Sequence, residues 1–190
     1  MSYVLVLYFS QGGATANLAR EIALGVESAG IEARVRRLES PNHPEPDNPV
    51  LLCDEADLAN CAALALGSPT RFGNMAWAVK HFLDSTGKLW MQGTLQNKPA
   101  CVFTSCSTAH GGHETTLLSM LIPLLHHGML LCGLLFDSTL RKTQSGGSPY
   151  GVTHMALEGN PQLSAEEQTL CRTQGKRIAQ LVQNLQHSYP

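Results

Sequence analysis

The sequence predicts an α/β fold: a five-stranded parallel sheet in strand order 2-1-3-4-5, with helices on both faces. Apolar runs typical of buried strands alternate with segments of helical periodicity along the whole chain. The second of these strands is the charged one, which suits a place at the sheet edge. With 190 residues, of which 43% are hydrophobic and 15% charged, the chain can bury the core of one domain, residues 1–190.

The first part of the chain gives two strands and one helix. Tyr3–Phe9 is an unbroken apolar, β-prone run and predicts a buried strand. Ala14–Ala29 places its apolar residues on one face and predicts a helix, which Gly30 ends. Ile31–Leu38 alternates apolar and charged residues, as a half-exposed edge strand does. Residues 39–49 hold four prolines in eleven residues and predict an irregular surface excursion.

Two further strands flank the next helix. The run CAALALG, residues 61–67, predicts a third buried strand, and the loop SPTRFGN follows it at residues 68–74. A helix is expected from Met75 to about Ser85. The run PACVFTS, residues 99–105, predicts the fourth strand.

The last part of the chain completes the sheet. Residues 114–128 predict a mostly buried helix, bent where Pro123 removes a donor. The run MLLCGLLF, residues 129–136, predicts the fifth strand, and a long loop is expected over residues 137–163. Ser164–Glu167, with the sequence SAEE, predicts a capping box that starts the final helix.

Three loops follow strands one, three and four, where the flavodoxin-like strand order places the ligand. They read SQGGAT, SPTRFGN and SCSTAHGGH, and all are rich in Ser, Thr and Gly, which let backbone amides approach an anion. The first opens a helix and contains no Lys or Arg. Main-chain amides, the helix terminus and the Ser10 and Thr15 hydroxyls are therefore expected to hold a phosphate, in a mononucleotide site. Taken alone, Gly12–Gly13 is equally compatible with a plain tight turn.

Composition limits the partners and the compartment. The formal net charge of −2 gives no sign of nucleic-acid or anionic-membrane binding, and no apolar run approaches the roughly 18 residues of a bilayer span. The six cysteines form no C-x-x-C motif, which favours reduced thiols. A cytoplasmic protein is the expectation.

Four motifs carry a family resemblance. GSPTRFGNM (67–75), FLDSTGKLW (82–90), HHGM (126–129) and GGSPYG (146–151) resemble those of the WrbA-type NAD(P)H:quinone oxidoreductases, which are flavodoxin-like proteins that use FMN. The likeness runs nearly end to end. It implies two-electron reduction of quinones by NAD(P)H through FMN, with ping-pong kinetics, in a homotetramer.

The resemblance also implies roles for individual residues. Trp90 would wall the pocket where quinone or nicotinamide stacks, and His126 would approach the flavin ring. Gly12 stands where the family usually has an aromatic residue, and the third loop is longer than usual. The implied FMN-binding residues are Ser10, Gln11, Gly12, Gly13, Ala14, Thr15, Thr70, Arg71, Phe72, Ser105, Cys106, Ser107, Thr108, Ala109, His110, Gly111 and His126.

Two aromatic residues suggest subunit contacts. On its helix, Trp77 falls opposite the apolar face and beside charged residues, which is typical of an interface residue. Tyr150 is either a turn anchor or a contact to a neighbouring subunit. Trp90 sits in a segment that reads as a loop, where an aromatic residue favours a binding wall.

Two other functions compete with a quinone reductase. A flavodoxin-type one-electron carrier would share the fold and FMN but lack a substrate pocket of its own. A zinc-binding hydrolase would use Cys106, His110 and His113, whose spacing is compatible with a metal, although that loop belongs to the cofactor under the favoured interpretation and no metal is expected. His126 and His127 precede Gly128 and also suit a helix C-terminus.

Overall fold

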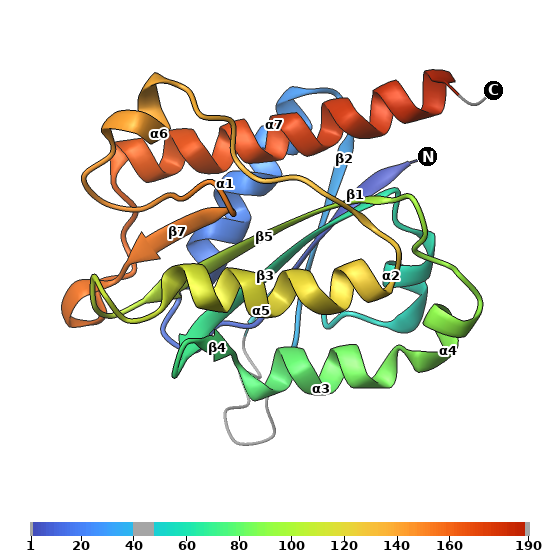
Figure 1. Ribbon diagram of the computed structural model, residues 1–190, viewed down its shortest axis with the longest axis horizontal. Coiled ribbons are helices and arrows are strands. Elements are labelled where there is room, and N and C mark those ends of the chain that lie inside the picture. The colour runs from blue at the N-terminus through green and yellow to red at the C-terminus, as the bar shows by residue number, and fades with distance from the viewer. Residues whose placement is uncertain (1, 40–47, 189–190) are drawn as a thin grey trace.

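The structure is a computed structural model that describes residues 2–39 and 48–188 (Figure 1). Residues 40–47, which make up most of the proline-rich excursion expected from the sequence, lie outside the described residues.

Five parallel strands form the centre of the molecule. They are β1 (Tyr3–Tyr8), β2 (Glu32–Arg37), β3 (Ala63–Arg71), β5 (Pro99–Cys106) and β6 (Leu130–Leu131). Their order across the sheet is β2-β1-β3-β5-β6, so the order 2-1-3-4-5 is confirmed, with the charged strand at the edge. The chain reverses its direction of winding between β1 and β3, so a crevice forms beyond the carboxyl ends of these strands.

Two short strands bring the described sheet to seven strands, and the expected fifth strand is shorter than predicted. The β4 strand (Asn74–Met75) pairs antiparallel with β3, and β7 (Val152–Met155) pairs parallel with β5. Residues 129–136 were expected to form one strand, but only β6 pairs there, with the start of β5. A side chain at Gly133 would lie 2.0 Å from the Pro149 carbonyl oxygen, so a turn crosses the chain at this point. The carboxyl-terminal half of β5 therefore pairs with β7 instead of β6.

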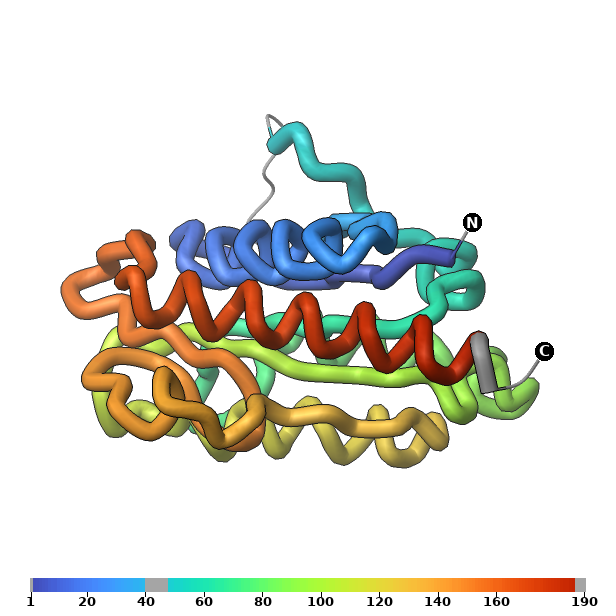
Figure 2. Tube along the Cα trace, turned by 90° about the horizontal axis from the view of Figure 1, so that it is seen from above, coloured from blue at the N-terminus to red at the C-terminus, as the bar shows by residue number. Residues whose placement is uncertain are grey.

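Two helices cover one face of the sheet side by side (Figure 2). They are α1 (Ala14–Ser28) and α7 (Ala165–Ser188). A Cβ on Gly175 would lie 2.0 Å from the Ile22 carbonyl oxygen, so the two helix backbones cross at a distance that only glycine allows. The capping box that starts α7 is confirmed. The Glu167 amide donates to Ser164 Oγ at 3.1 Å, and the Ser164 amide donates to the Glu167 carboxylate at 2.8 Å.

The other face carries α3 (Trp77–Ser85) and α5 (His113–His126). The short helix α4 (Gly87–Met91) follows α3, so the expected loop around Trp90 is helical instead. The remaining helices are α2 (Glu55–Asn60), α6 (Ser138–Lys142) and the 3-10 turn η1 (Leu157–Gly159). The expected loop 137–163 therefore holds α6, β7 and η1. Among the described residues, no helix combines the length and apolar character needed to cross a membrane.

Alternation along the strands builds two cores, one on each face. From β1, Val4 and Val6 pack with α1 and α7, whereas Leu5 and Leu7 pack with α3 and α5. All four are fully buried, and each contributes roughly 1.5–3 kcal/mol of burial free energy. The two cores hold the sheet rigid, and the loops at its carboxyl edge are built on that frame.

Candidate functional site

The first loop leaves the start of α1 open. Gly13 caps the helix in the left-handed conformation, with φ at 85°, and its amide donates to Ser10 Oγ at 3.1 Å. No side chain caps the first turn, and no acidic residue lies in it. Amides at a helix start that lack a side-chain cap, together with the positive end of the helix dipole, suit a phosphate.

A buried hydroxyl pair joins the first loop to the third. Thr15 Oγ1 lies 2.8 Å from Ser105 Oγ, and the two residues are 1% and 5% exposed. The Thr15 hydroxyl, expected to face a phosphate, is thus shared with the end of β5. Ser105 can still direct one lone pair or its proton elsewhere, because each hydroxyl has one donor and two acceptor positions.

The second loop is the tip of a hairpin. Thr70 and Arg71 belong to β3 and pair with β4, and Phe72 forms the turn with φ at 52°. The Phe72 ring is fully exposed. The Arg71 guanidinium donates to Gln11 Oε1, which ties the second loop to the first, and to the Thr70 carbonyl at 2.9 Å.

These three loops enclose one cavity of about 280 Å³. Gln11, Thr70 and Ser105 line it, one from each loop. The far wall is formed by Ala156 and Gly159, which the sequence did not indicate. Both are small residues with no reactive side chain, and they lie there because they directly follow β7, which pairs with the end of β5. The only signal in the sequence was the length of the loop expected over residues 137–163, which contains them.

The third loop places its titratable residues apart. Cys106 ends β5 and lines the cavity, and His110 is exposed at the loop tip. His113 begins α5 and is buried, with Nε2 donating to the His154 carbonyl at 3.3 Å. In the part of the chain that the structure describes, no three His, Cys, Asp or Glu side chains gather to hold a metal ion.

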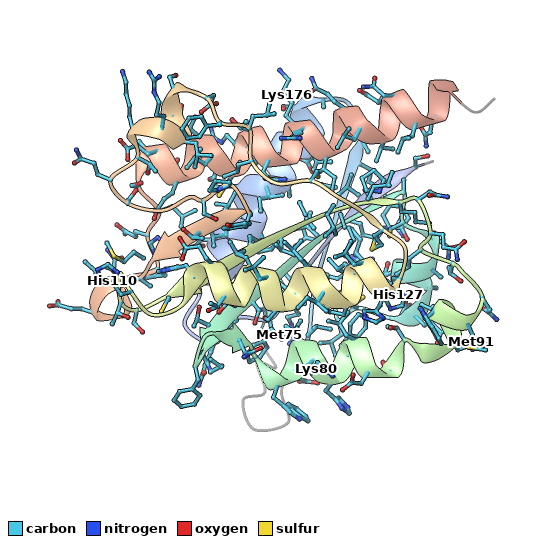
Figure 3. All side chains as sticks on the ribbon, viewed as in Figure 1. Met75, Lys80, Met91, His110, His127 and Lys176 are labelled. Carbon is cyan, nitrogen blue, oxygen red and sulfur yellow. The ribbon has the colours of Figure 1, made fainter. Side chains whose placement is uncertain are left out.

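Trp90 and His126 line a different cavity, of about 780 Å³, between α3 and α5. The Trp90 indole N–H donates to the His126 carbonyl at 2.9 Å. Figure 3 places His110 and His127 at opposite ends of α5, a helix of 14 residues and hence about 20 Å long. Within one chain, His126 and Trp90 are therefore not brought to the three loops.

The floor of this groove is His127. Thr86 Oγ1 donates to the Leu83 carbonyl at 2.7 Å, so His127 Nε2–H must donate to Thr86 Oγ1, 2.9 Å away. Burial, together with the neighbouring His126, lowers the pKa of His127.

Trp77 forms one wall of the groove. It is 56% exposed and stacks on His81, with ring centroids 4.9 Å apart. The expectation that Trp77 lies on the exposed face of its helix is confirmed, since Val79 and Leu83 are buried on the other. Tyr150 lies at a tight turn and is 45% exposed.

Fold and cavity together define a class: a flavodoxin-like α/β protein with a crevice at the carboxyl edge of its sheet. Solved structures agree on the fold. A WrbA-like flavodoxin from Agrobacterium tumefaciens superposes with a TM-score of 0.72 at 23% identity, over 97% of this chain and 99% of that one. Oxidised Flavodoxin 2 from Bacillus cereus gives 0.64 at 17% identity, over 97% and 99%.

The family follows from the sequence comparisons. The model of the NADPH-dependent FMN reductase family matches residues 3–133, and the chain belongs to this family. A protein of Gluconacetobacter diazotrophicus named NAD(P)H dehydrogenase (quinone) is 39% identical over 97% of this chain and 99% of its own. One of the same name from Chromohalobacter salexigens is 40% identical, with the same coverage. Family and fold together point to FMN as the cofactor.

Proposed function

We propose that this protein is an FMN-dependent NAD(P)H:quinone oxidoreductase of one domain, residues 1–190. The observation that carries the proposal is the open N-terminus of α1 at a cavity shared by three loops. The names of the two relatives near 40% identity support the substrates, NAD(P)H and quinone. When bound, FMN supplies the redox chemistry, accepting hydride from the nicotinamide and passing two electrons to the quinone.

The chain's own residues hold and orient the cofactor in this proposal. The amides of Ala14 and Thr15, with the Ser10 hydroxyl, hold the phosphate at the helix start. Arg71 and Phe72 flank the ring system, the first as a donor and the second as an apolar face. The third loop closes the opposite side of the ring. It comprises Ser105, Cys106, Ser107, Thr108, Ala109, His110 and Gly111.

We further propose a homotetramer in which a neighbouring copy completes each site. Trp90 and His126 line the groove between α3 and α5 and not the three-loop cavity of their own chain, so we place them beside the flavin of another chain. The groove presents exposed apolar side chains at Trp77, Trp90 and Ile122, a pattern that interfaces favour. Tyr150 is assigned to the same kind of contact.

The groove also separates the proposal from its main competitor. A one-electron flavodoxin-type carrier needs only the cofactor cavity, whereas a second cavity of about 780 Å³ with aromatic walls suits a flat substrate ring.

The compartment proposed is the cytoplasm. All six cysteines are free thiols, and four of them are buried. Reduced thiols suit a compartment that also supplies reduced nicotinamide. The formal charge of −2 offers no basic surface for nucleic acid or anionic lipid, so neither is proposed as a partner.

Rapid mixing tests the proposal. Protein loaded with FMN is mixed with NADH or NADPH without oxygen, and flavin absorbance is followed before and after addition of benzoquinone. We expect fast bleaching by one nicotinamide and immediate recovery with quinone, and no turnover by FMN-free protein. Slow bleaching by both nicotinamides would contradict the reductase and favour the carrier.

A further inference from the structure

A buried acid–base pair lies directly behind the cofactor cavity. His154 is on β7, next to Ser105 in the sheet, and Glu167 is in the first turn of α7. Their side chains are 4% and 2% exposed, with His154 Nδ1 3.0 Å from the Glu167 carboxylate. The other ring nitrogen, Nε2, lies 3.0 Å from the Asn160 carbonyl oxygen.

This geometry fixes the protonation of the imidazole. Glu167 is ionised, because hydrogen bonds from His154 and the Ser164 amide outweigh burial and lower its pKa. Its carboxylate and the Asn160 carbonyl are then both acceptors, so each ring nitrogen must carry a proton to bond to both. A neutral imidazole has one N–H and would leave one of these bonds unmade. His154 is thus held as an imidazolium between Glu167 and Asn160.

The second bond acts on a wall of the cavity. Asn160 belongs to the segment 156–163, from which Ala156 and Gly159 line the cavity. The same segment contacts the first loop, because Asn17 Nδ2 donates to the Pro161 carbonyl at 2.9 Å. Pro161 also lies against Gly13, the residue that caps α1. Through its bond to Asn160, the His154 side chain therefore anchors the segment 156–163. This segment contacts both the cavity and the start of α1, where the phosphate is expected.

We propose that His154 is a positioning residue for the cofactor: its imidazolium, held by Glu167, fixes the segment 156–163, and FMN is retained tightly only while that proton is bound. The proposal rests on the assignment of FMN to the three-loop cavity. It goes beyond the quinone reductase assignment, because it names a proton on which cofactor retention depends.

The direction of the pH effect follows from the surroundings of the pair. Burial opposes the charged imidazole, but the hydrogen bonds to Glu167 and Asn160 outweigh it and raise the pKa of His154. Among the described residues, the titratable groups facing the pair are His113 from α5, and Cys171 one turn further along α7. Neither offers a second negative charge at neutral pH. Retention should thus be strongest near neutral pH and weaken as the pH rises through the raised pKa.

The first experiment needs no cofactor. Long-range ¹H–¹⁵N NMR spectra of the FMN-free protein distinguish imidazolium from neutral imidazole, and His154→Gln identifies the signal by its absence. We expect His154 to remain an imidazolium above its ordinary pKa of about 6.5. A neutral His154 at that pH would overturn the proposal.

The second experiment measures FMN affinity by quenching of flavin fluorescence, without nicotinamide or quinone. The wild-type dissociation constant should rise about tenfold as the pH is raised from neutral through the point at which the NMR spectra show His154 to lose its proton, the loss expected for one charge-assisted hydrogen bond. His154→Gln should show the weak value throughout, without pH dependence. Val182→Ala, a buried change in the same helix near its other end, should keep the wild-type profile.

The outcomes separate two failures. A wild-type profile in His154→Gln, or a flat wild-type profile, would overturn the positioning role and leave the quinone reductase assignment intact. Normal pH-linked binding without quinone reduction would overturn only the proposed function. Failure of the wild-type protein to bind FMN would overturn both.

Discussion

Thr15 Oγ1 and Ser105 Oγ share a buried hydrogen bond of 2.8 Å across ninety positions of sequence. It joins the first turn of α1 to the carboxyl end of β5. The first and third loops of the cofactor cavity therefore cannot separate without leaving a buried hydroxyl without a partner, which costs about 1–3 kcal/mol.

Thr15→Ala should loosen this junction. We expect the free energy of unfolding to fall by about 1–2 kcal/mol, because Ser105 loses its partner, and FMN affinity to fall about fivefold. Thr15→Ser keeps the hydroxyl and should retain most of both. Urea denaturation and flavin fluorescence measure the two effects. Equal behaviour of the alanine and serine variants would contradict a role for the hydroxyl.

Gly13 and Gly12 offer a matched pair of changes in one loop. Gly13 has a left-handed φ of 85°, so Gly13→Ala should cost about 1 kcal/mol of stability and displace the amides at the start of α1. Gly12 has open space around it, and Gly12→Ala should change stability by less than about 0.5 kcal/mol. Isothermal titration with FMN should show a loss for Gly13→Ala. A larger loss for Gly12→Ala would place the phosphate elsewhere.

The sequence predicted the strands, helices and three loops because these depend on local patterns, and it predicted the strand order because five strands with a charged second strand suit the flavodoxin-like topology. Apolar runs, helix periodicity and the Ser164–Glu167 capping box are written within a few neighbouring residues. The split of the fifth strand is not local. The run 129–136 signals burial, but pairing there depends on a turn at Pro149 that crosses the chain, which only the assembled structure reveals.

The same distinction explains the site. Thr70, Arg71 and Ser105 lie where their loops were expected to meet. Ala156 and Gly159 have no chemical signature, and the His154–Glu167 pair joins two elements whose approach depends on β7 pairing with β5. Trp90 and His126 lie in motifs shared with the family, but a motif does not indicate whether a residue contributes to the site of its own chain or to that of a neighbouring chain.

Trp77→Ala tests the proposed assembly. Trp77 is half-exposed beside Lys80 and Asp84, and truncating a central aromatic residue of an interface costs about 2 kcal/mol or more. We expect a smaller mass by light scattering at micromolar concentration. Leu24→Ala, which trims an exposed apolar residue on α1, should leave the mass unchanged. An unchanged mass in Trp77→Ala would exclude it from the interface.

Trp90→Phe tests the role of the groove in the substrate step. The change keeps an aromatic face but removes the indole N–H that donates to the His126 carbonyl at 2.9 Å. We expect the KM for benzoquinone to rise about threefold to tenfold with FMN affinity nearly unchanged, because Trp90 is proposed to wall the substrate pocket and phenylalanine keeps an aromatic face there. Trp90→Ala should raise it further. Equal kcat/KM values in all three proteins would remove Trp90 from the substrate pocket.

The His154–Glu167 pair should also govern the pH dependence of folding in the FMN-free protein. Hydrogen bonds from His154 and the Ser164 amide outweigh burial and lower the pKa of Glu167, while the pKa of His154 is raised. The raised histidine contributes stability that is complete below its unfolded pKa and is lost as the pH rises through its folded pKa. The lowered glutamate contributes stability that is lost as the pH falls through its folded pKa. Unfolding free energy should therefore be highest between the ordinary pKa values of glutamate, 4.5, and histidine, 6.5, and should fall toward acid and toward alkaline pH.

Glu167→Gln should remove the alkaline limb of that profile, because His154 then has no carboxylate to hold its proton. It should also cost about 3 kcal/mol at neutral pH, as expected when one partner of a buried pair is lost. Glu166→Gln changes the adjacent, exposed carboxylate, which only accepts from the Gln144 amide and Thr143, and should cost less than about 1 kcal/mol with the limb retained. Urea denaturation at intervals from acid to alkaline pH measures both variants. An alkaline limb that persists in Glu167→Gln would assign it to another group and remove the charge from this pair.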